Sequence, residues 1–114
     1  MDTALITKWV TPFPGREKRA LEYAAEVSDH WGKLAADGKC TEPEFFYFGD
    51  SGMWMTKGKR DELLELTYTD ESRRLLAKGR FLLQGFTWEL AATGSDAEQT
   101  MLAYGRVAEE YGTV

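Results

Sequence analysis

The sequence is poor in the residues that form disulfides and metal sites. It contains one cysteine, Cys40, and one histidine, His30, among 114 residues. A single cysteine cannot form an intramolecular disulfide, and neither residue belongs to a spaced group of the kind that binds zinc. We therefore expect no metal site and no cofactor, and we expect the protein to work in a reducing cytoplasm.

Long apolar runs and an excess of positive charge are also missing. No apolar stretch approaches the roughly 20 residues that span a bilayer, and the first residues lack the basic and long apolar regions of a signal peptide. The net charge is −5, so the chain lacks the positive charge that supplies most non-specific affinity for nucleic acids. The glycine-rich phosphate loop and the dinucleotide fingerprint are absent as well. We expect neither a membrane nor a nucleic-acid partner.

Aromatic residues, by contrast, are plentiful. They make up 13% of the chain and include four tryptophans, and side chains of this size have to be buried in a core or an interface. Neither a repeat nor a linker divides the sequence, and its length is typical of one domain. We therefore predict a single domain over residues 1–114.

The hydrophobic periodicity alternates between that of strands and that of helices. It predicts strands at 4–10, 44–48, 53–57 and 86–92, and helices at 16–36, 59–66 and 69–83, followed by a last helix that ends near residue 112. Thr69-Asp70 can cap the third helix, and Ser95 with Glu98 has the spacing of a capping box for the last one. The order β-α-β-β-α-β with an extra C-terminal helix predicts an α+β, ferredoxin-like fold.

The hairpin at 44–56, EFFYFGDSGMWMT, is apolar on both sides of its turn. A half-buried hairpin normally alternates apolar with polar residues, so neither face of this one is suited to water. A bulged turn closed by Gly52 would place Phe46 and Trp54 on one face, and a two-residue loop would exchange the partners. Either register leaves large apolar groups on both faces, which predicts an association site. The alternative is a monomer whose C-terminal helix folds over its own sheet.

A chain of this length and element order, with aromatic strands and a terminal helix, resembles the dimeric α/β-barrel superfamily. The most similar stretch is 59–90, KRDELLELTYTDESRRLLAKGRFLLQGFTWEL, a leucine-rich helix pair followed by an aromatic strand that ends in Glu-Leu. The resemblance implies a homodimer in which two sheets pack face to face. It constrains function loosely, because the superfamily includes cofactor-free monooxygenases, isomerases, lactone- and haem-handling enzymes, and members with no known activity.

The strand patterns suggest which side chains enter the space between two such sheets. Phe86, Trp88 and Leu90 form a uniformly apolar set that suits the helix layer, so Glu89 points the other way, as does Lys8 on the first strand. We expect a small apolar or aromatic molecule to bind in this space. The predicted binding residues are Lys8, Phe46, Tyr47, Trp54 and Glu89.

Catalysis is the alternative, with Glu89, His30 or Tyr47 handling protons. A purely structural or regulatory interaction module with a filled interface is a third reading. The ordinary interpretation of Lys8 and Glu89 is a solvated ion pair at the rim, and that of His30 is an accessible residue beside the apolar stripe of its helix.

Overall fold

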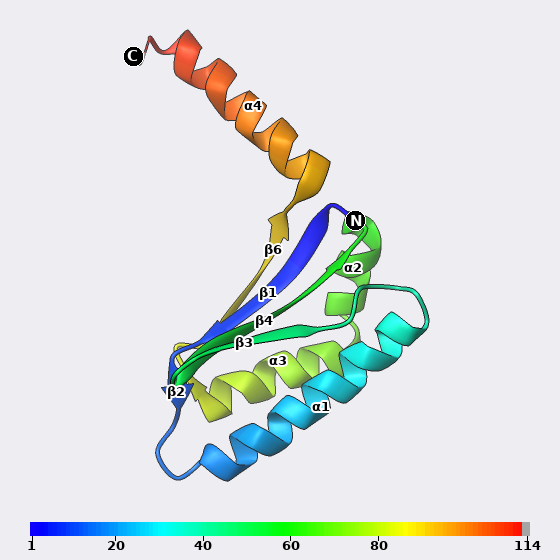
Figure 1. The fold of residues 1–114 in the computed structure, drawn as a ribbon, viewed down its shortest axis with the longest axis vertical. Helices are drawn as coiled ribbons and strands as arrows, with labels where there is room; N and C mark the ends of the chain where they lie inside the picture. Colours follow the sequence, from blue (N-terminus) through cyan, green and yellow to red (C-terminus); the bar gives the residue numbers. More distant parts are fainter. Residues whose placement is uncertain (113–114) are drawn as a thin grey trace.

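Four antiparallel strands form one sheet, and helices cover one of its two faces (Figure 1). The computed structural model describes residues 1–112. The elements are β1 (Thr3–Trp9), β2 (Thr11–Pro12), α1 (Glu17–Ala36), β3 (Glu44–Phe48), β4 (Ser51–Gly58), α2 (Arg60–Thr67), α3 (Asp70–Leu82), β5 (Leu83–Gln84), β6 (Thr87–Ala92) and α4 (Gly94–Glu110). The sheet order is β3-β4-β1-β6, and β2 pairs with β5 in a small second sheet. The expected α+β class is confirmed. Within residues 1–112 the sheet stays open rather than closing into a barrel.

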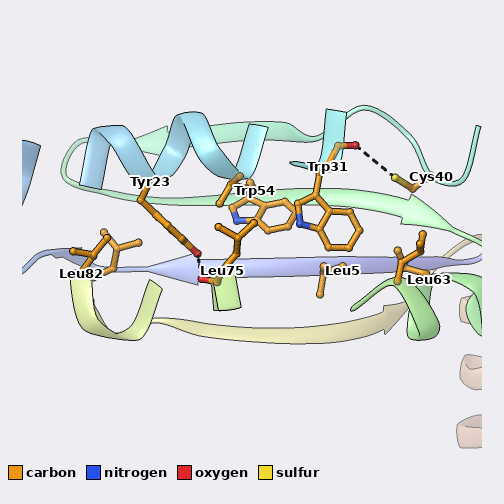
Figure 2. Close-up of a cluster of buried hydrophobic side chains, with 11 residues drawn as sticks. Leu5, Tyr23, Trp31, Cys40, Trp54, Leu63, Leu75 and Leu82 are labelled. Carbon is orange, nitrogen blue, oxygen red and sulfur yellow. Dashed lines mark hydrogen bonds between the residues drawn. The ribbon is translucent and has the colours of Figure 1, made fainter. Parts of the chain in front are cut away.

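The helix α1 forms where the sequence predicts it and packs on the sheet through one stripe. Tyr23, Val27 and Trp31 are its buried residues, four residues apart as one face of an α-helix requires. Trp31 meets Trp54 of β4 with ring centroids 5.7 Å apart, so the contact joins helix and sheet at the centre of the core (Figure 2).

The second half of the helix layer consists of α2 and α3. Leu63 on α2 and Leu75 and Leu82 on α3 are buried in the same core cluster as Leu5 of β1. The N-cap of α3 is confirmed as Thr69, whose Oγ1 accepts a hydrogen bond from the backbone N–H of Ser72 at 3.3 Å. This cap starts α3 two residues after α2 ends, so the two helices predicted at 59–66 and 69–83 are also two in the structure.

The hairpin adopts the two-residue loop, not the bulged turn. Phe48 pairs with Ser51, and Phe45 pairs with Trp54. Gly49 has a φ of 72°, while none of the described non-glycine residues has a positive φ, which is the pattern of a turn with glycine at its first central position. Phe45, Tyr47 and Trp54 therefore face the helices.

Within residues 1–112, the other face of the sheet carries no helix (Figure 1). Alternation along the strands places Phe46, Phe48, Met53, Met55 and Ile6 on it. Phe48 is 62% exposed, and the other four are partly exposed. We call this surface the open sheet face.

The last helix, α4, projects from the end of β6 away from the other elements (Figure 1), and none of its residues is buried. Its start differs from the prediction. The N-cap is Thr93, which makes no side-chain capping bond, so the capping box expected at Ser95 and Glu98 is wrong. Instead, the Thr93 N–H donates to the carbonyl oxygen of Asp2 at 2.9 Å and ties the start of α4 to β1.

Among residues 1–112, no helix is long and apolar enough to cross a membrane.

Candidate functional site

A pocket of about 280 Å³ lies between α1 and the β3–β4 hairpin, on the helix-covered side of the sheet. We call it the α1–hairpin pocket. Its lining comprises Trp9, Pro12, Glu17, Ala20, Leu21, Tyr23, Ala24, Val27, Phe45, Tyr47, Gly49, Asp50, Trp54, Leu83 and Phe86. Most of these side chains are apolar or aromatic, and the charged ones, Glu17 and Asp50, belong to exposed residues. This composition is typical of sites for small apolar ligands.

The aromatic wall of the pocket depends on a close approach between β1 and β4. Gly52 lies opposite Trp9 in the strand register, and a Cβ at Gly52 would lie 2.5 Å from the Trp9 ring. The glycine therefore leaves room for the indole to lie across β4. From there Trp9 meets Tyr47 edge-to-face at 6.1 Å, and Phe45 stacks beside Tyr47 at 6.4 Å. The three rings extend the wall outward from Trp54.

Trp54 brings a hydrogen-bond donor to this apolar wall. The residue is 2% exposed, and its Nε1 has no hydrogen-bond partner. Figure 2 shows the indole nitrogen on the edge of the ring that faces Tyr23, which lines the same pocket. A buried N–H without a partner costs about 1–3 kcal/mol. Because the nitrogen is fully buried, an acceptor atom on a bound molecule would remove that cost only after a neighbouring side chain moves.

Thr7 carries the other buried polar atom that has no hydrogen-bond partner. Among the described residues, its Oγ1 and Trp54 Nε1 are the two buried side-chain polar atoms without a partner. The two residues are direct cross-strand neighbours on β1 and β4, so the two unpartnered groups belong to one cross-strand pair. Buried polar groups are nearly always paired, so the two residues are exceptions, and of the two only Trp54 lines the α1–hairpin pocket.

Tyr23 supplies a neutral hydroxyl that is already occupied. Its OH donates to the backbone oxygen of Leu75 at 2.7 Å (Figure 2), and burial, followed by the nearby Glu26 carboxylate, raises the pKa of the phenol above its ordinary value. The phenol therefore stays protonated at neutral pH. Its hydrogen bond joins α1 to α3 and fixes the position of the Tyr23 ring in the pocket lining.

The predicted binding residues are divided between the two faces of the sheet. Tyr47 and Trp54 line the α1–hairpin pocket, whereas Phe46, Lys8 and Glu89 lie on the open sheet face. The expectation that Trp54 borders a space between two sheets is therefore wrong, because the two-residue loop turns it toward the helices and leaves Met55 on the open sheet face.

Lys8 and Glu89 share a face but do not lie opposite each other. Lys8 pairs with Thr87, and Glu89 pairs with Ile6. Both are exposed, and the ion pairs found among residues 1–112 do not include one between them.

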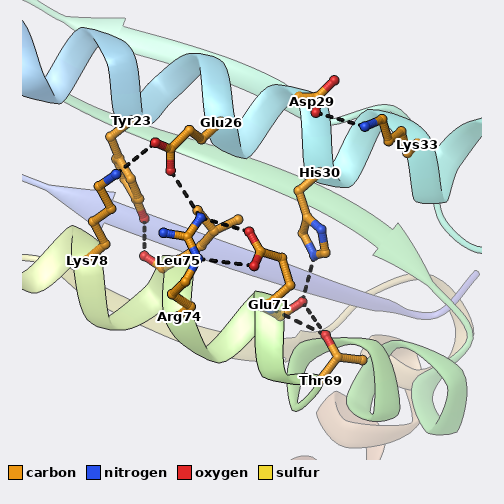
Figure 3. A network of polar contacts seen from close by, with 11 residues as sticks. Tyr23, Glu26, Asp29, His30, Lys33, Thr69, Glu71, Arg74, Leu75 and Lys78 are labelled. Atoms are coloured by element: carbon orange, nitrogen blue, oxygen red, sulfur yellow. Dashed lines mark hydrogen bonds and ion pairs between the residues drawn. The ribbon is translucent and has the colours of Figure 1, made fainter.

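His30 lies away from the pocket and from Glu89. Its Nε2 is 2.9 Å from Ser72 Oγ at the start of α3 (Figure 3), and its ring contacts Trp31 edge-to-face at 5.4 Å. The residue is half-buried, and this burial lowers the pKa of its imidazole. The three candidate catalytic residues therefore do not converge on one site.

Within the described part of the chain, no cluster of three or more His, Cys, Asp or Glu side chains is placed to hold a metal.

Several pocket residues were not predicted from the sequence, among them Trp9, Phe45 and Phe86. Each faces the helix layer, where the sequence suggested ordinary core packing. The signal that could have pointed to them is Gly52, since a glycine directly after a turn and opposite a tryptophan predicts a close approach of backbone and ring.

The fold is shared with solved structures, although no sequence family identifies the chain. No protein-family model matches it, and no curated protein matches it in sequence. Rv0793 from Mycobacterium tuberculosis is similar in structure, with 15% identity, a TM-score of 0.63, and coverage of 82% of this chain and 96% of that one.

Two further structures agree. A conserved protein of unknown function from Bacteroides thetaiotaomicron, described as a possible oxidoreductase, has 15% identity and a TM-score of 0.61, covering 80% of this chain and 97% of its own. PA3566 from Pseudomonas aeruginosa has 17% identity and a TM-score of 0.57, covering 82% and 94%. At these identities the likeness concerns the fold, a small α+β architecture.

Proposed function

We propose that this protein is a homodimeric binding protein of the dimeric α/β-barrel type that holds a small aromatic molecule with a hydrogen-bond acceptor. The observation that carries the proposal is the buried, unpartnered Trp54 Nε1 on the wall of the α1–hairpin pocket. The surrounding rings favour a flat ligand, and the buried Trp54 N–H favours a carbonyl or a similar acceptor on it.

The strand order supports the ferredoxin-like part of this proposal. A β-α-β-β-α-β chain whose first strand lies between its third and fourth, as β1 lies between β4 and β6, has the split βαβ arrangement. The open sheet face supports the dimer, because apolar surface of this extent on one chain calls for a cover. A second copy that packs the same face against it would supply one by two-fold symmetry.

The ligand site in this proposal differs from the one that the sequence suggested. The space between two sheets would be lined by Phe46, Phe48, Met53 and Met55, flexible and bulky side chains that can fill it. The α1–hairpin pocket is formed within one chain and already contains both the apolar walls and the donor. We therefore place the ligand on the helix side and the dimer contact on the open side.

An enzyme is the second candidate, and the structural neighbour described as a possible oxidoreductase is the observation that favours it. Cofactor-free oxygenase or isomerase chemistry needs a proton-transfer group beside the ligand. Of the three residues considered for that role, Tyr47 borders the pocket, and it is 65% exposed. Binding is therefore the better-supported function.

The test compares two probes of the same shape, α-tetralone and tetralin, which differ in a ketone oxygen. If Trp54 Nε1 donates to the ligand, the ketone should bind roughly 2- to 12-fold more tightly than the hydrocarbon, the range expected for one net hydrogen bond. Trp54→Phe keeps an aromatic wall but has no N–H, so it should abolish this preference. Binding is measured by isothermal titration calorimetry and by the ligand-dependent shift in melting temperature.

Tyr47→Phe is the matched control, because it removes a polar atom from the exposed rim and should keep the preference for the ketone. Equal affinity of the native protein for the two probes would contradict the role of Trp54. Failure of a series of small aromatic ketones and phenols to bind at all would contradict the binding function.

A further inference from the structure

A second groove lies between α3 and β6, at the edge of the sheet. It has a volume of about 480 Å³ and is lined by Tyr68, Arg73, Leu76, Ala77, Arg80, Phe81 and Trp88. We call it the α3–β6 groove. The strand β6 is an outer strand of the sheet, so the groove is open along its length to another molecule.

The groove combines an apolar floor with positive charge. Tyr68 and Trp88 contact edge-to-face at 5.9 Å, and Phe81 is 73% exposed. The guanidinium of Arg73 stacks over the Tyr68 ring at 5.2 Å. Neither Arg73 nor Arg80 takes part in an ion pair found among residues 1–112.

The other two cations of α3 are already neutralised. Arg74 and Lys78 contact Glu26 of α1 at 3.3 Å and 2.7 Å, and Arg74 also contacts Glu71 (Figure 3). The groove therefore combines the two arginines of α3 that lie outside the ion pairs of residues 1–112 with aromatic rings, of which Tyr68 and Phe81 are exposed. A partner that fits it has an apolar stripe and negative charge.

The helix α4 has both of these properties. Met101, Tyr104 and Val107 follow the three-residue spacing of a helical stripe and are all at least half exposed. The same helix carries four carboxylates, Asp96, Glu98, Glu109 and Glu110, against one arginine. Its apolar stripe and its negative charge thus complement the α3–β6 groove.

The same helix is not packed into the core of its own chain, since none of its residues is buried. A helix of 17 residues with Gly105 in its middle has little stability without packing. The radius of gyration is 16.6 Å, whereas a compact domain of this length has roughly 13 Å. The bond from Thr93 to Asp2 fixes the start of the helix, and the helix then runs away from its own α3 (Figure 1).

From these observations we infer that α4 of one copy packs into the α3–β6 groove of a second copy, and that the exchange is reciprocal. The contact is a helix-in-groove interaction. The stripe of Met101, Tyr104 and Val107 covers Phe81 and Trp88, and carboxylates that flank the stripe, such as Glu110 one turn after Val107, face the arginines of the groove. This inference concerns a different surface from the open sheet face and does not depend on the ligand.

The test is disulfide trapping between two differently substituted full-length chains. Tyr104→Cys lies on the apolar stripe of α4, and Ala77→Cys lies in the groove on the exposed side of α3. The natural Cys40 is buried and does not compete. After the two proteins are mixed and mildly oxidised, mass spectrometry should find a disulfide that joins position 104 of one chain to position 77 of the other.

Arg106→Cys is the matched control, since it lies on the opposite side of α4 from Tyr104. It should give a several-fold lower yield of the link to Ala77→Cys. A chain with both Tyr104→Cys and Ala77→Cys reports on the alternative, because a disulfide within one chain means that α4 folds back on its own groove. That outcome, or equal yields with the control, would overturn the inference.

A charge exchange provides a second measurement that does not rely on thiols. Arg80→Glu should weaken the association roughly two- to fivefold, the range expected for an exposed ion pair, and Glu110→Lys in the same chain, one turn after Val107, should restore it. Absence of any restoration would contradict the charge complementarity. A designed or natural acidic helical peptide that displaces α4 with equal affinity would show that the groove is a general site for acidic helices and would overturn the commitment to a second copy.

Discussion

At the scale of single residues, His30 is the group whose charge responds nearest to neutral pH. Burial lowers its pKa from the ordinary 6.5, and the neighbouring carboxylates of Glu71 and Asp29 oppose that shift while Arg74 and Lys33 add to it. The folded state therefore favours the neutral ring. Below pH 6.5 the unfolded chain takes up a proton that the folded chain resists, so stability falls as the pH falls.

We expect the free energy of unfolding to decrease between about pH 7 and pH 5, and His30→Gln to flatten this decrease. Glutamine keeps a group that can bond to Ser72 but has no proton to gain. Urea denaturation at several pH values measures the effect. Glu26 and Glu71 have lowered pKa values, so their contributions are lost below 4.5, outside this window. An equal slope in the variant would contradict the prediction.

The residue scale is also where the sequence was least informative. Trp54 and Met55 are adjacent and both apolar, so their faces follow only from the turn. Because the turn is a loop of two residues and not a bulge, Trp54 points into the core and Met55 lies on the open sheet face. Hydrophobicity cannot distinguish these registers when both faces are apolar. The orphan indole N–H of Trp54 was unpredictable for the same reason, since it depends on what surrounds the ring.

At the scale of elements, prediction succeeded where an alternating or helical pattern had one polar side. The strand β6 shows this well, because Trp88 and Leu90 pack toward the core and Glu89 is exposed, as its alternation predicts. It was less accurate for α4, whose apolar residues follow a helical stripe although none is buried in its own chain. A stripe predicts that a helix needs a partner. It does not say where that partner is.

Gly79 is an element-scale feature with a role in packing. A glycine in a helix interior costs about 1 kcal/mol relative to alanine, yet α3 runs unbroken from Asp70 to Leu82. A Cβ at Gly79 would lie 2.4 Å from the Phe86 ring and 2.7 Å from the Tyr23 hydroxyl. The glycine therefore lets α3 approach the two side chains that line the α1–hairpin pocket.

We expect Gly79→Ala to destabilise the protein by about 1–3 kcal/mol, the usual cost of overpacking, although alanine favours a helix by about 1 kcal/mol. Gly32→Ala in α1 is the control, because nothing lies within 4 Å of its Cβ position, and it should be neutral or stabilising. Urea denaturation of both variants gives the comparison. Equal stabilisation by the two substitutions would mean that the packing around Gly79 is loose.

At the scale of the whole molecule, two surfaces of one chain lack a cover, and they call for different kinds of contact. The open sheet face is broad and carries an apolar group that includes the direct cross-strand pair of Phe46 and Met53, with Lys8 next to Met53 on β1. The helix α4 offers a narrow stripe with charge beside it. A sheet contact and a helix exchange can therefore occur in one assembly, and each has to be tested with the other removed.

The sheet contact is tested in a chain that carries Tyr104→Asp, which places a charge on the apolar stripe of α4. We expect this chain to remain a dimer, with twice the chain mass of 12.9 kDa by light scattering at micromolar concentration. Adding Met53→Arg should weaken the dimer by about 100-fold or more, because an unpaired buried charge costs several kcal/mol and the symmetry places it in the interface twice.

Leu64→Arg, at an exposed position of α2, is the matched control for that charge and should leave the mass unchanged. Circular dichroism should show the same helix and strand content in all three proteins, so that a loss of mass reports dissociation rather than unfolding. A chain with Tyr104→Asp alone that is already a monomer would mean that the open sheet face does not hold the dimer. In that case the helix exchange would be the main contact, and the apolar hairpin would need a different partner.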